Sequence, residues 1–227
     1  PEFSRYGVDL NEQVRLKASQ YLYLICVEEP EKAQDIIEVI FRNTLDPSLW
    51  ETSGPEFQYL SPESINLLGQ LGKSYSTLIT QRLIDALSIV PVPVKRMILD
   101  ALGDIGEVKE NLRGILDKIS PLFGDQRTDV RTAAFQAVTE MILEGQNQDK
   151  EFTRLVLQHI YTVLQSYIEE PEVVDSALEA LVQMSSKIAD DIALEKIQSF
   201  LEYRCPQNKA IEGYILQNTI VILGYMV

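Results

Sequence analysis

With 227 residues, 45% of them apolar and 24% charged, the chain has the composition of an ordinary folded protein and not of a disordered one. Its 20 basic and 34 acidic side chains give a formal charge of −14, which opposes extended contact with a phosphate backbone and disfavours nucleic acid as a partner. No apolar run reaches the length of about 18 residues that a membrane-spanning helix needs, so we expect no contact with a membrane.

The cysteines and the two chain ends bear on where the protein works and how far its domain extends. Cys26 and Cys205 lie far apart within helical patterns, so we expect two small core residues in a reduced, cytoplasmic or nuclear protein. Residues 1–3 resemble a cloning remnant, and residues 220–227 stop on apolar side chains without a polar closing element. We therefore expect one domain over residues 4–227, taken from a longer protein whose remainder is one of its partners.

A helical template recurs along the chain. Successive copies are separated by 46, 34, 36, 43 and 42 residues, and their first apolar residues, the anchors, are Val14, Leu60, Val94, Val130, Val173 and Ile215. Within a copy, small or apolar side chains follow the anchor by 4, 7 and 8 positions, as Ala18, Tyr21 and Leu22 do in the first. These offsets fall on one stripe of a helix. Each copy therefore predicts an amphipathic helix with one buried face, and the second and sixth copies match only in part.

The longest interruption follows the first copy. Residues 43–62 hold Trp50, the only tryptophan of the chain. Long loops in repeat proteins are often functional, and tryptophan is a common anchor at interfaces. Trp50 is therefore a candidate contact for a partner, and the alternative is that it packs on a neighbouring helix.

A second helical pattern lies between successive anchors, at residues 78–89, 108–123, 152–168 and 192–203. Turn residues separate the patterns, and proline in particular is tolerated in the first turn of a helix but not in its interior. The residues that mark these boundaries are Pro91, Pro93, Gly124, Asp125, Pro171 and Pro206. Sustained apolar and polar alternation is missing, so we expect helix pairs and no strands.

Two copies carry a specific resemblance. Val94-Lys95 is followed by the segment 101–106, which reads Ala-Leu-Gly-Asp-Ile-Gly, and Asp129-Val130-Arg131 opens the next copy. These residues resemble HEAT repeats. The resemblance implies an all-α fold, a right-handed α-solenoid of about five to six helix pairs whose second helices line the concave side. It also implies binding or scaffolding, although some members of the family are chromophore lyases.

Basic residues follow three of the anchors, namely Arg15, Lys95 and Arg131. HEAT repeats often carry a basic residue there that ties adjacent turns together, so the resemblance implies a structural ladder. Contact with a ligand is the alternative. Val174 and Leu216 interrupt the row, so a continuous basic track is not present.

Polar residues occupy the sixth position after most anchors, roughly opposite the buried stripe. They are Gln20, Asn66, Asp100, Gln136 and Glu179, and Asp104, Glu140 and Asp175 add carboxylates near them. Such a row would bind a peptide or protein through hydrogen bonds and would attract basic side chains. The alternative is an ordinary solvated helix face.

Signals for catalysis are sparse. His159 is the sole histidine, so a paired-histidine metal site cannot form, and no Gly-x-Ser-x-Gly segment accompanies it. We therefore name no catalytic, cofactor-binding or metal-binding residue. The glycines of the repeat register permit close helix packing or a left-handed terminal residue, and they are Gly69, Gly72, Gly103 and Gly106.

The sequence thus predicts a scaffold or adaptor that presents a curved, acidic surface to a peptide or protein, and not an enzyme. The alternative is a HEAT-like lyase or chaperone that handles a small molecule or chromophore.

Overall fold

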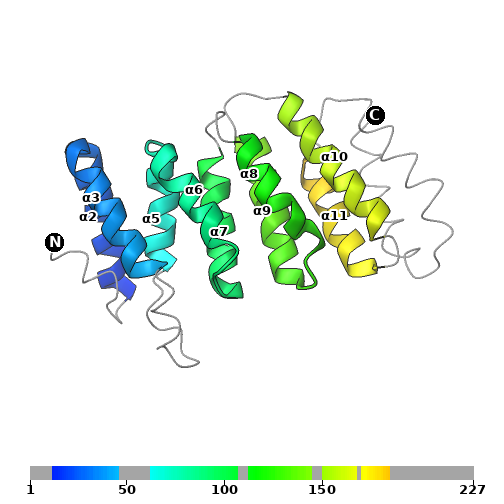
Figure 1. Cartoon of the computed structure of the whole chain (residues 1–227), viewed down its shortest axis with the longest axis horizontal. Helices are drawn as coiled ribbons and strands as arrows, with labels where there is room; N and C mark the ends of the chain where they lie inside the picture. The colour runs from blue at the N-terminus through cyan, green and yellow to red at the C-terminus, as the bar shows by residue number, and fades with distance from the viewer. Residues whose placement is uncertain (1–11, 46–61, 107–111, 145–149, 168–169, 185–227) are drawn as a thin grey trace. The chain divides into compact units, whose positions relative to one another are not determined.

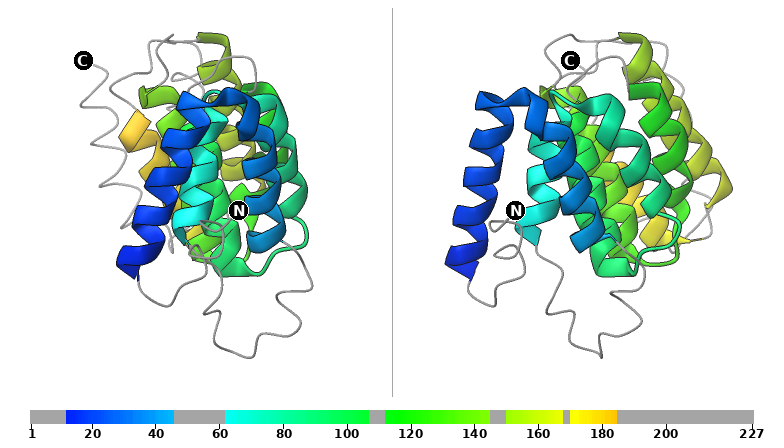
Figure 2. Two further views of the ribbon diagram at one scale, coloured as in Figure 1. Left: turned by 90° about the vertical axis from the view of Figure 1, so that its left-hand side faces the viewer. Right: turned by 60° about the vertical axis from the view of Figure 1, so that its left-hand side comes forward.

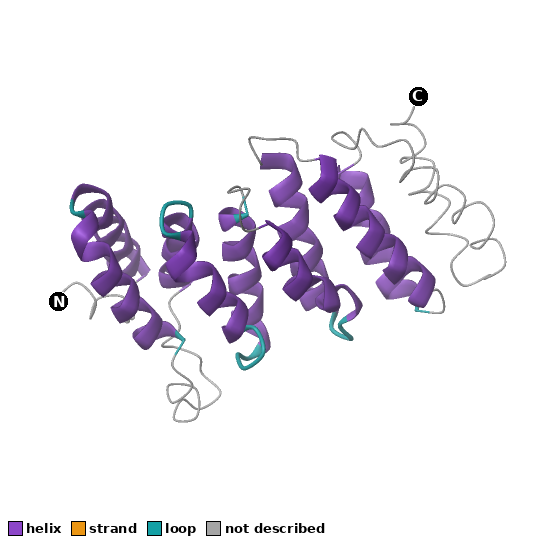
Figure 3. Cartoon of the chain, turned by 45° about the horizontal axis from the view of Figure 1, so that its top comes forward, coloured by secondary structure: helices purple, strands orange, loops and turns teal. Residues whose placement is uncertain are grey.

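The computed structural model describes residues 12–45, 62–106, 112–144, 150–167 and 170–184, and every regular element in these ranges is a helix (Figure 3). The prediction of an all-α protein is confirmed for this part of the chain. By their contacts the residues divide into two compact units, Pro1–Asn111 and Leu112–Val227. A single domain over residues 4–227 stays a prediction.

The first unit consists of two layers of helices. Helices α2 (Glu12–Glu28), α5 (Pro62–Gly72) and α7 (Val92–Ile105) follow one another side by side, with α5 in contact with both others (Figure 1). Helix α3 (Pro30–Thr44) packs on α2 and α5, and α6 (Ser76–Ala86) packs on α5 and α7. The template helices therefore form one layer of this unit, and the helices between them form the other.

Arg82 of α6 connects α6 to α3, the two helices that form the second layer of the first unit. Its guanidinium donates a hydrogen bond of 2.6 Å to Glu38 of α3 and lies 3.9 Å from the centre of the Phe41 ring. A cation over an aromatic face is attracted by the ring quadrupole. Because Arg82 and Glu38 are partly exposed, water screens the ion pair, and the packing of Phe41 contributes more to stability than the charges do.

Glycine sets how closely α5 and α7 approach. A Cβ atom at Gly72 would lie 2.3 Å from Cγ1 of Ile105, and one at Gly69 would lie 3.1 Å from Cα of Ala101. No glycine with a positive φ occurs in the described ranges. Of the two roles expected for these glycines, close helix packing therefore applies to Gly69 and Gly72.

The second unit repeats the layered plan. Helix α9 (Thr128–Glu144) lies beside α11 (Pro171–Met184), and α8 (Leu112–Ile119), the 3-10 helix η2 (Ser120–Gly124) and α10 (Lys150–Ser166) pack against them. The rings of two buried residues, one from η2 and one from α9, stack with their centroids 4.4 Å apart, and these are Phe123 and Phe135. This stack fixes the turn between the layers of the unit.

Several predicted boundaries differ from the structure. The pattern expected over residues 108–123 divides into α8 and η2, because Pro121 lacks the backbone N–H that would continue the α-helix. The pattern at 78–89 corresponds to a helix that begins earlier, at Ser76, and ends at Ala86. The pattern at 152–168 begins earlier, at Lys150. The segment 192–203 and the anchors Leu60 and Ile215 lie outside the described residues.

Helix α3 lies where no helix is named from the sequence. Pro30 opens it at a position that needs no intrahelical N–H, and its buried side chains recur at three and four positions. They are Ala33, Ile37, Ile40, Phe41 and Thr44. The signal was therefore present in the sequence. Of the interruption expected at 43–62, the first two residues belong to the last turn of α3, and residues 46–61 lie outside the described residues.

Cys26 is a core residue, as its sequence context predicts. Its side chain has no exposed surface, and burial raises the pKa of the thiol to about 11. The Tyr75 hydroxyl donates a hydrogen bond of 2.9 Å to the Cys26 carbonyl and so joins the turn after α5 to α2. Cys205 lies outside the described residues.

Candidate partner-binding surface

A row of polar side chains lies on the outward face of the α2, α5 and α7 layer. Gln20, Asn66 and Asp100 are all exposed, one from each helix, and the three helices are neighbours in the order of the chain. Asp104 is half-buried one turn beyond Asp100. A Cβ atom at Gly69 would lie 3.0 Å from Oδ2 of Asp104, so the glycine makes room for this carboxylate against α5.

The electrostatics of Asp100 favour a cationic neighbour. Partial removal of water by the surrounding atoms raises the pKa of the Asp100 carboxyl, the negative charge of Asp104 raises it further, and Arg96 lowers it. The ionised form of Asp100 is therefore less favourable here than in a fully hydrated chain. A cation placed near Asp100 and Asp104 would favour the ionised form of Asp100 and so offset the rise in its pKa.

Replacing Asp100 by asparagine is expected to stabilise the chain slightly at pH 7. A carboxyl whose pKa is raised on folding lowers stability wherever it is ionised, and this loss disappears as the pH falls below the ordinary value of about 4. Urea unfolding of both proteins at pH 7 and pH 3 measures the effect. The variant should be more stable than the wild-type chain at pH 7 and equally stable at pH 3. A variant that is less stable at pH 7 would contradict the claim that folding raises the pKa of Asp100.

The second unit carries a matching row. On α9, Gln136 is exposed and donates a hydrogen bond of 3.0 Å to Glu140, which is half-buried. On the adjacent α11, Glu179 is exposed and Asp175 is half-buried. Since α9 and α11 lie side by side, the outward face of this layer carries carboxylates and an amide on two neighbouring helices.

The basic residues after two anchors join one template helix to the next. Arg15 of α2 donates two hydrogen bonds, of 3.1 and 3.3 Å, to the carboxylate of Glu63 on α5. Arg131 of α9 lies 3.8 Å from the carboxylate of Glu172 on α11. Lys95 is half-buried on α7. In the first unit, the arginine in this position therefore connects adjacent helices of the layer. In the second unit, the contact between Arg131 and Glu172 is weak, because it is long and the carboxylate is exposed.

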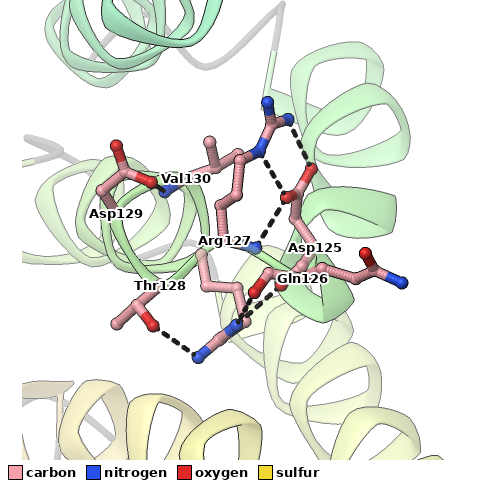
Figure 4. A network of polar contacts seen from close by, with 7 residues as sticks. Asp125, Gln126, Arg127, Thr128, Asp129 and Val130 are labelled. Carbon is pink, nitrogen blue, oxygen red and sulfur yellow. Dashed lines mark hydrogen bonds and ion pairs between the residues drawn. The ribbon is translucent and has the colours of Figure 1, made fainter.

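Arg131 makes its closest contacts with the turn that precedes α9, whose residues Asp125, Gln126 and Thr128 are labelled in Figure 4. Its side chain is only 1% exposed, and it donates hydrogen bonds of 2.8 and 3.1 Å to the carbonyls of Asp125 and Gln126. A third bond, of 3.1 Å, reaches Oγ1 of Thr128. Among the residues that the structure describes, Nε of Arg131 has no hydrogen-bond partner. The guanidinium therefore acts as an internal staple of this turn.

Other predicted or excluded features are placed only in part. Trp50 lies outside the described residues, and His159 is half-buried on α10. Across the described ranges, no three His, Cys, Asp or Glu side chains form a group that would hold a metal ion. None of the helices in those ranges is long and apolar enough to cross a membrane.

The prediction that α2 has a single buried apolar face is wrong. Tyr21, expected on the buried stripe, is 55% exposed, and four more large apolar side chains of α2 are exposed as well. These are Leu16, Tyr23, Leu24 and Val27. The sequence signal was the distribution of apolar residues around the whole helix, which a template that reads one stripe does not register.

No family model and no curated protein sequence matches the chain. One solved structure, described as the crystal structure of an engineered protein, is 16% identical and has a TM-score of 0.44, over 99% of this chain and 96% of that chain. A similarity of this strength carries no argument about fold or function. Membership in the HEAT-repeat family and the alternative of a small-molecule lyase or chaperone both stay predictions.

Proposed function

We propose that the chain is a protein-interaction scaffold, a HEAT-like α-solenoid of about five to six helix pairs that binds a basic peptide or protein along its outward polar rows. The layered helix pairs within each unit support the repeat plan. The proposal extends that plan along the whole chain, as a right-handed stack.

The observation that carries the binding role is the exposure of all five predicted row residues that the structure describes. They are Gln20, Asn66, Asp100, Gln136 and Glu179. Each lies on a helix whose opposite side is packed against its unit, so the positions of the backbones are set before any partner arrives. A partner therefore meets a preorganised surface, which reduces the entropy lost on binding.

Charge decides the class of partner that this surface fits. The chain as a whole has a formal charge of −14. Part of this charge lies on the outward faces, on two carboxylates of the row and on three beside it, which are Asp100, Glu179, Asp104, Glu140 and Asp175. Complementary charges speed the encounter of two proteins and suppress pairing with partners of the same sign. A lysine- or arginine-rich protein segment is therefore the expected ligand.

Retention of proteins from a nuclease-treated cell extract tests this proposal. The full chain is immobilised, and the retained proteins are quantified by mass spectrometry. In a row variant the substitutions are Asp100→Asn, Asp104→Asn, Glu140→Gln and Glu179→Gln. We expect this variant to lose a set of basic proteins that the wild-type chain retains.

A charge-matched control variant makes the result specific to the row. Its substitutions lie on the other layer of each unit, at Asp35→Asn, Asp85→Asn, Asp117→Asn and Glu151→Gln. It changes the net charge by the same amount, so it should retain the same proteins as the wild-type chain. Equal retention by the row variant and the wild-type chain would rule out the row as the binding surface.

A further inference from the structure

Two glycine contacts show that α5 and α7 run in the same direction. A Cβ atom at Gly69 would meet Ala101. A Cβ atom at Gly72, about one turn later on α5, would meet Ile105, about one turn later on α7. The two helices are neighbours in one layer (Figure 2). Their C-terminal ends, at Gly72 and Ile105, therefore lie at the same end of the layer.

The carboxylate of Asp104 lies at this shared end. Asp104 is the next-to-last residue of α7, and its Oδ2 lies 3.0 Å from the place of a Cβ atom at Gly69, in the last turn of α5. The last carbonyl groups of a helix carry a partial negative charge. The carboxylate is therefore next to the negative ends of two helices, and neither helix has a basic residue in its last turn.

This placement is unfavourable for a carboxylate and favourable for a cation. The negative end of a helix repels a like charge. The charge of Asp104 also raises the pKa of the Asp100 carboxyl, while Arg96 lowers it. Lys73, which directly follows α5, is an exposed basic residue of the chain itself near this end. A basic side chain of a partner would join Lys73 or replace it there, attracted by both carboxylates and both helix ends.

Gly69 is the residue that lets the carboxylate lie against α5. A Cβ atom there would also lie 3.1 Å from Cα and 3.3 Å from Cβ of Ala101. The packed backbone of α7 moves less easily than a carboxylate, which can rotate about its side-chain bonds. A methyl group on Gly69 would therefore displace the Asp104 carboxylate away from α5. Alanine is the better helix former, so glycine has no local advantage at this position.

We propose that Gly69 is a positioning residue for partner binding, which seats the Asp104 carboxylate against α5, where it holds the guanidinium or ammonium group of a basic side chain. This inference rests on the proposed function and deepens it, because it names the carboxylate that holds the partner's cation and the residue that places it. Natural sequences keep an electrostatically unfavourable arrangement mainly where function requires it. The other possible role of Gly69 is close packing of α5 on α7 alone.

Titration of the full chain with a basic peptide tests the proposal. The probe is a fluorescein-labelled, arginine-rich peptide of about ten residues, followed by fluorescence anisotropy in about 150 mM salt. Asp104→Asn removes the charge and should weaken binding about fivefold. Gly69→Ala keeps the charge but displaces it, and should weaken binding about threefold. The variant with both substitutions should bind no more weakly than Asp104→Asn, because the glycine acts only through this carboxylate.

Two further variants separate placement from packing. Asp104→Glu leaves Gly69 and the net charge unchanged but carries the carboxylate one methylene further out, so it should bind about threefold more weakly than the wild-type chain. Glu140→Gln lies in the second unit, so its loss of binding free energy should add to that of Gly69→Ala when the two are combined. Circular dichroism establishes that each variant remains folded.

The possible failures have different meanings. Wild-type affinity of Gly69→Ala or of Asp104→Glu would show that the placement of the carboxylate does not matter, and would overturn the inference. An equal loss from Gly69→Ala with and without Asp104→Asn would overturn it too, because the glycine would then serve packing alone. In these cases the wild-type chain still binds the peptide, so the proposed function stands. A wild-type chain that does not bind the peptide would contradict the proposed function, and this inference with it.

Discussion

Replacing Arg131 by alanine is expected to lower the free energy of unfolding by about 3–5 kcal/mol. The change leaves the carbonyls of Asp125 and Gln126 without their donor and opens a cavity where a fully buried side chain stood. The contact with Glu172 contributes little, because that carboxylate is 81% exposed and lies 3.8 Å away. Urea unfolding followed by circular dichroism measures the loss.

Two further variants separate the causes of this loss. Arg131→Met keeps most of the side-chain volume but still removes the hydrogen bonds. It should therefore lose less unfolding free energy than Arg131→Ala, but should still be less stable than the wild-type chain. Arg127→Ala removes an exposed side chain that donates hydrogen bonds to the carboxylate of Asp125, and it should leave unfolding nearly unchanged. If Arg131→Ala proved as stable as Arg127→Ala, the staple role of Arg131 would be wrong.

Gly72→Ala is expected to destabilise the first unit by about 1–3 kcal/mol, because the new methyl group overpacks the contact between α5 and α7. Its Cβ would lie 2.3 Å from Cγ1 and 2.5 Å from Cδ1 of Ile105, a side chain with no exposed surface. The backbone of Gly72 has no positive φ, so steric overlap and not backbone strain causes the loss. Thermal and urea unfolding of the variant measure it.

Gly114→Ala is the matched control for this overlap. Gly114 lies within α8, and a Cβ atom there would meet nothing within 4 Å. Alanine is the better helix former, so this variant should be more stable than the wild-type chain by about 0.5–1 kcal/mol. Opposite signs for the two glycine substitutions are the expected result, and a stabilising Gly72→Ala would contradict the close packing of α5 on α7.

The helical periodicity was enough to predict the buried side of most template helices. The anchors Val94, Val130 and Val173 are 1%, 0% and 2% exposed. The polar residues six positions later are exposed for the same geometric reason, since that offset points to the opposite side of a helix. These properties depend on local sequence alone, and a local pattern therefore predicts them.

Contacts between helices could not be predicted in this way. The arginine that joins α2 to α5 reaches a glutamate 48 positions away, and the space for Asp104 comes from a glycine on another helix. The exposure of Tyr21 shows the same limit, because the pattern of one helix does not tell which of its apolar sides has a neighbour. Such features depend on which helices pack together, and periodicity carries no information about that choice.

The salt dependence of binding tests the central claim most directly. A basic protein that the wild-type chain retains and the row variant loses is titrated against the full chain in about 50 mM and about 500 mM salt. If the acidic rows attract the partner, its affinity should fall at least about tenfold at the higher concentration. An affinity that is the same at both concentrations would contradict the claim that the charges of this surface select its partner.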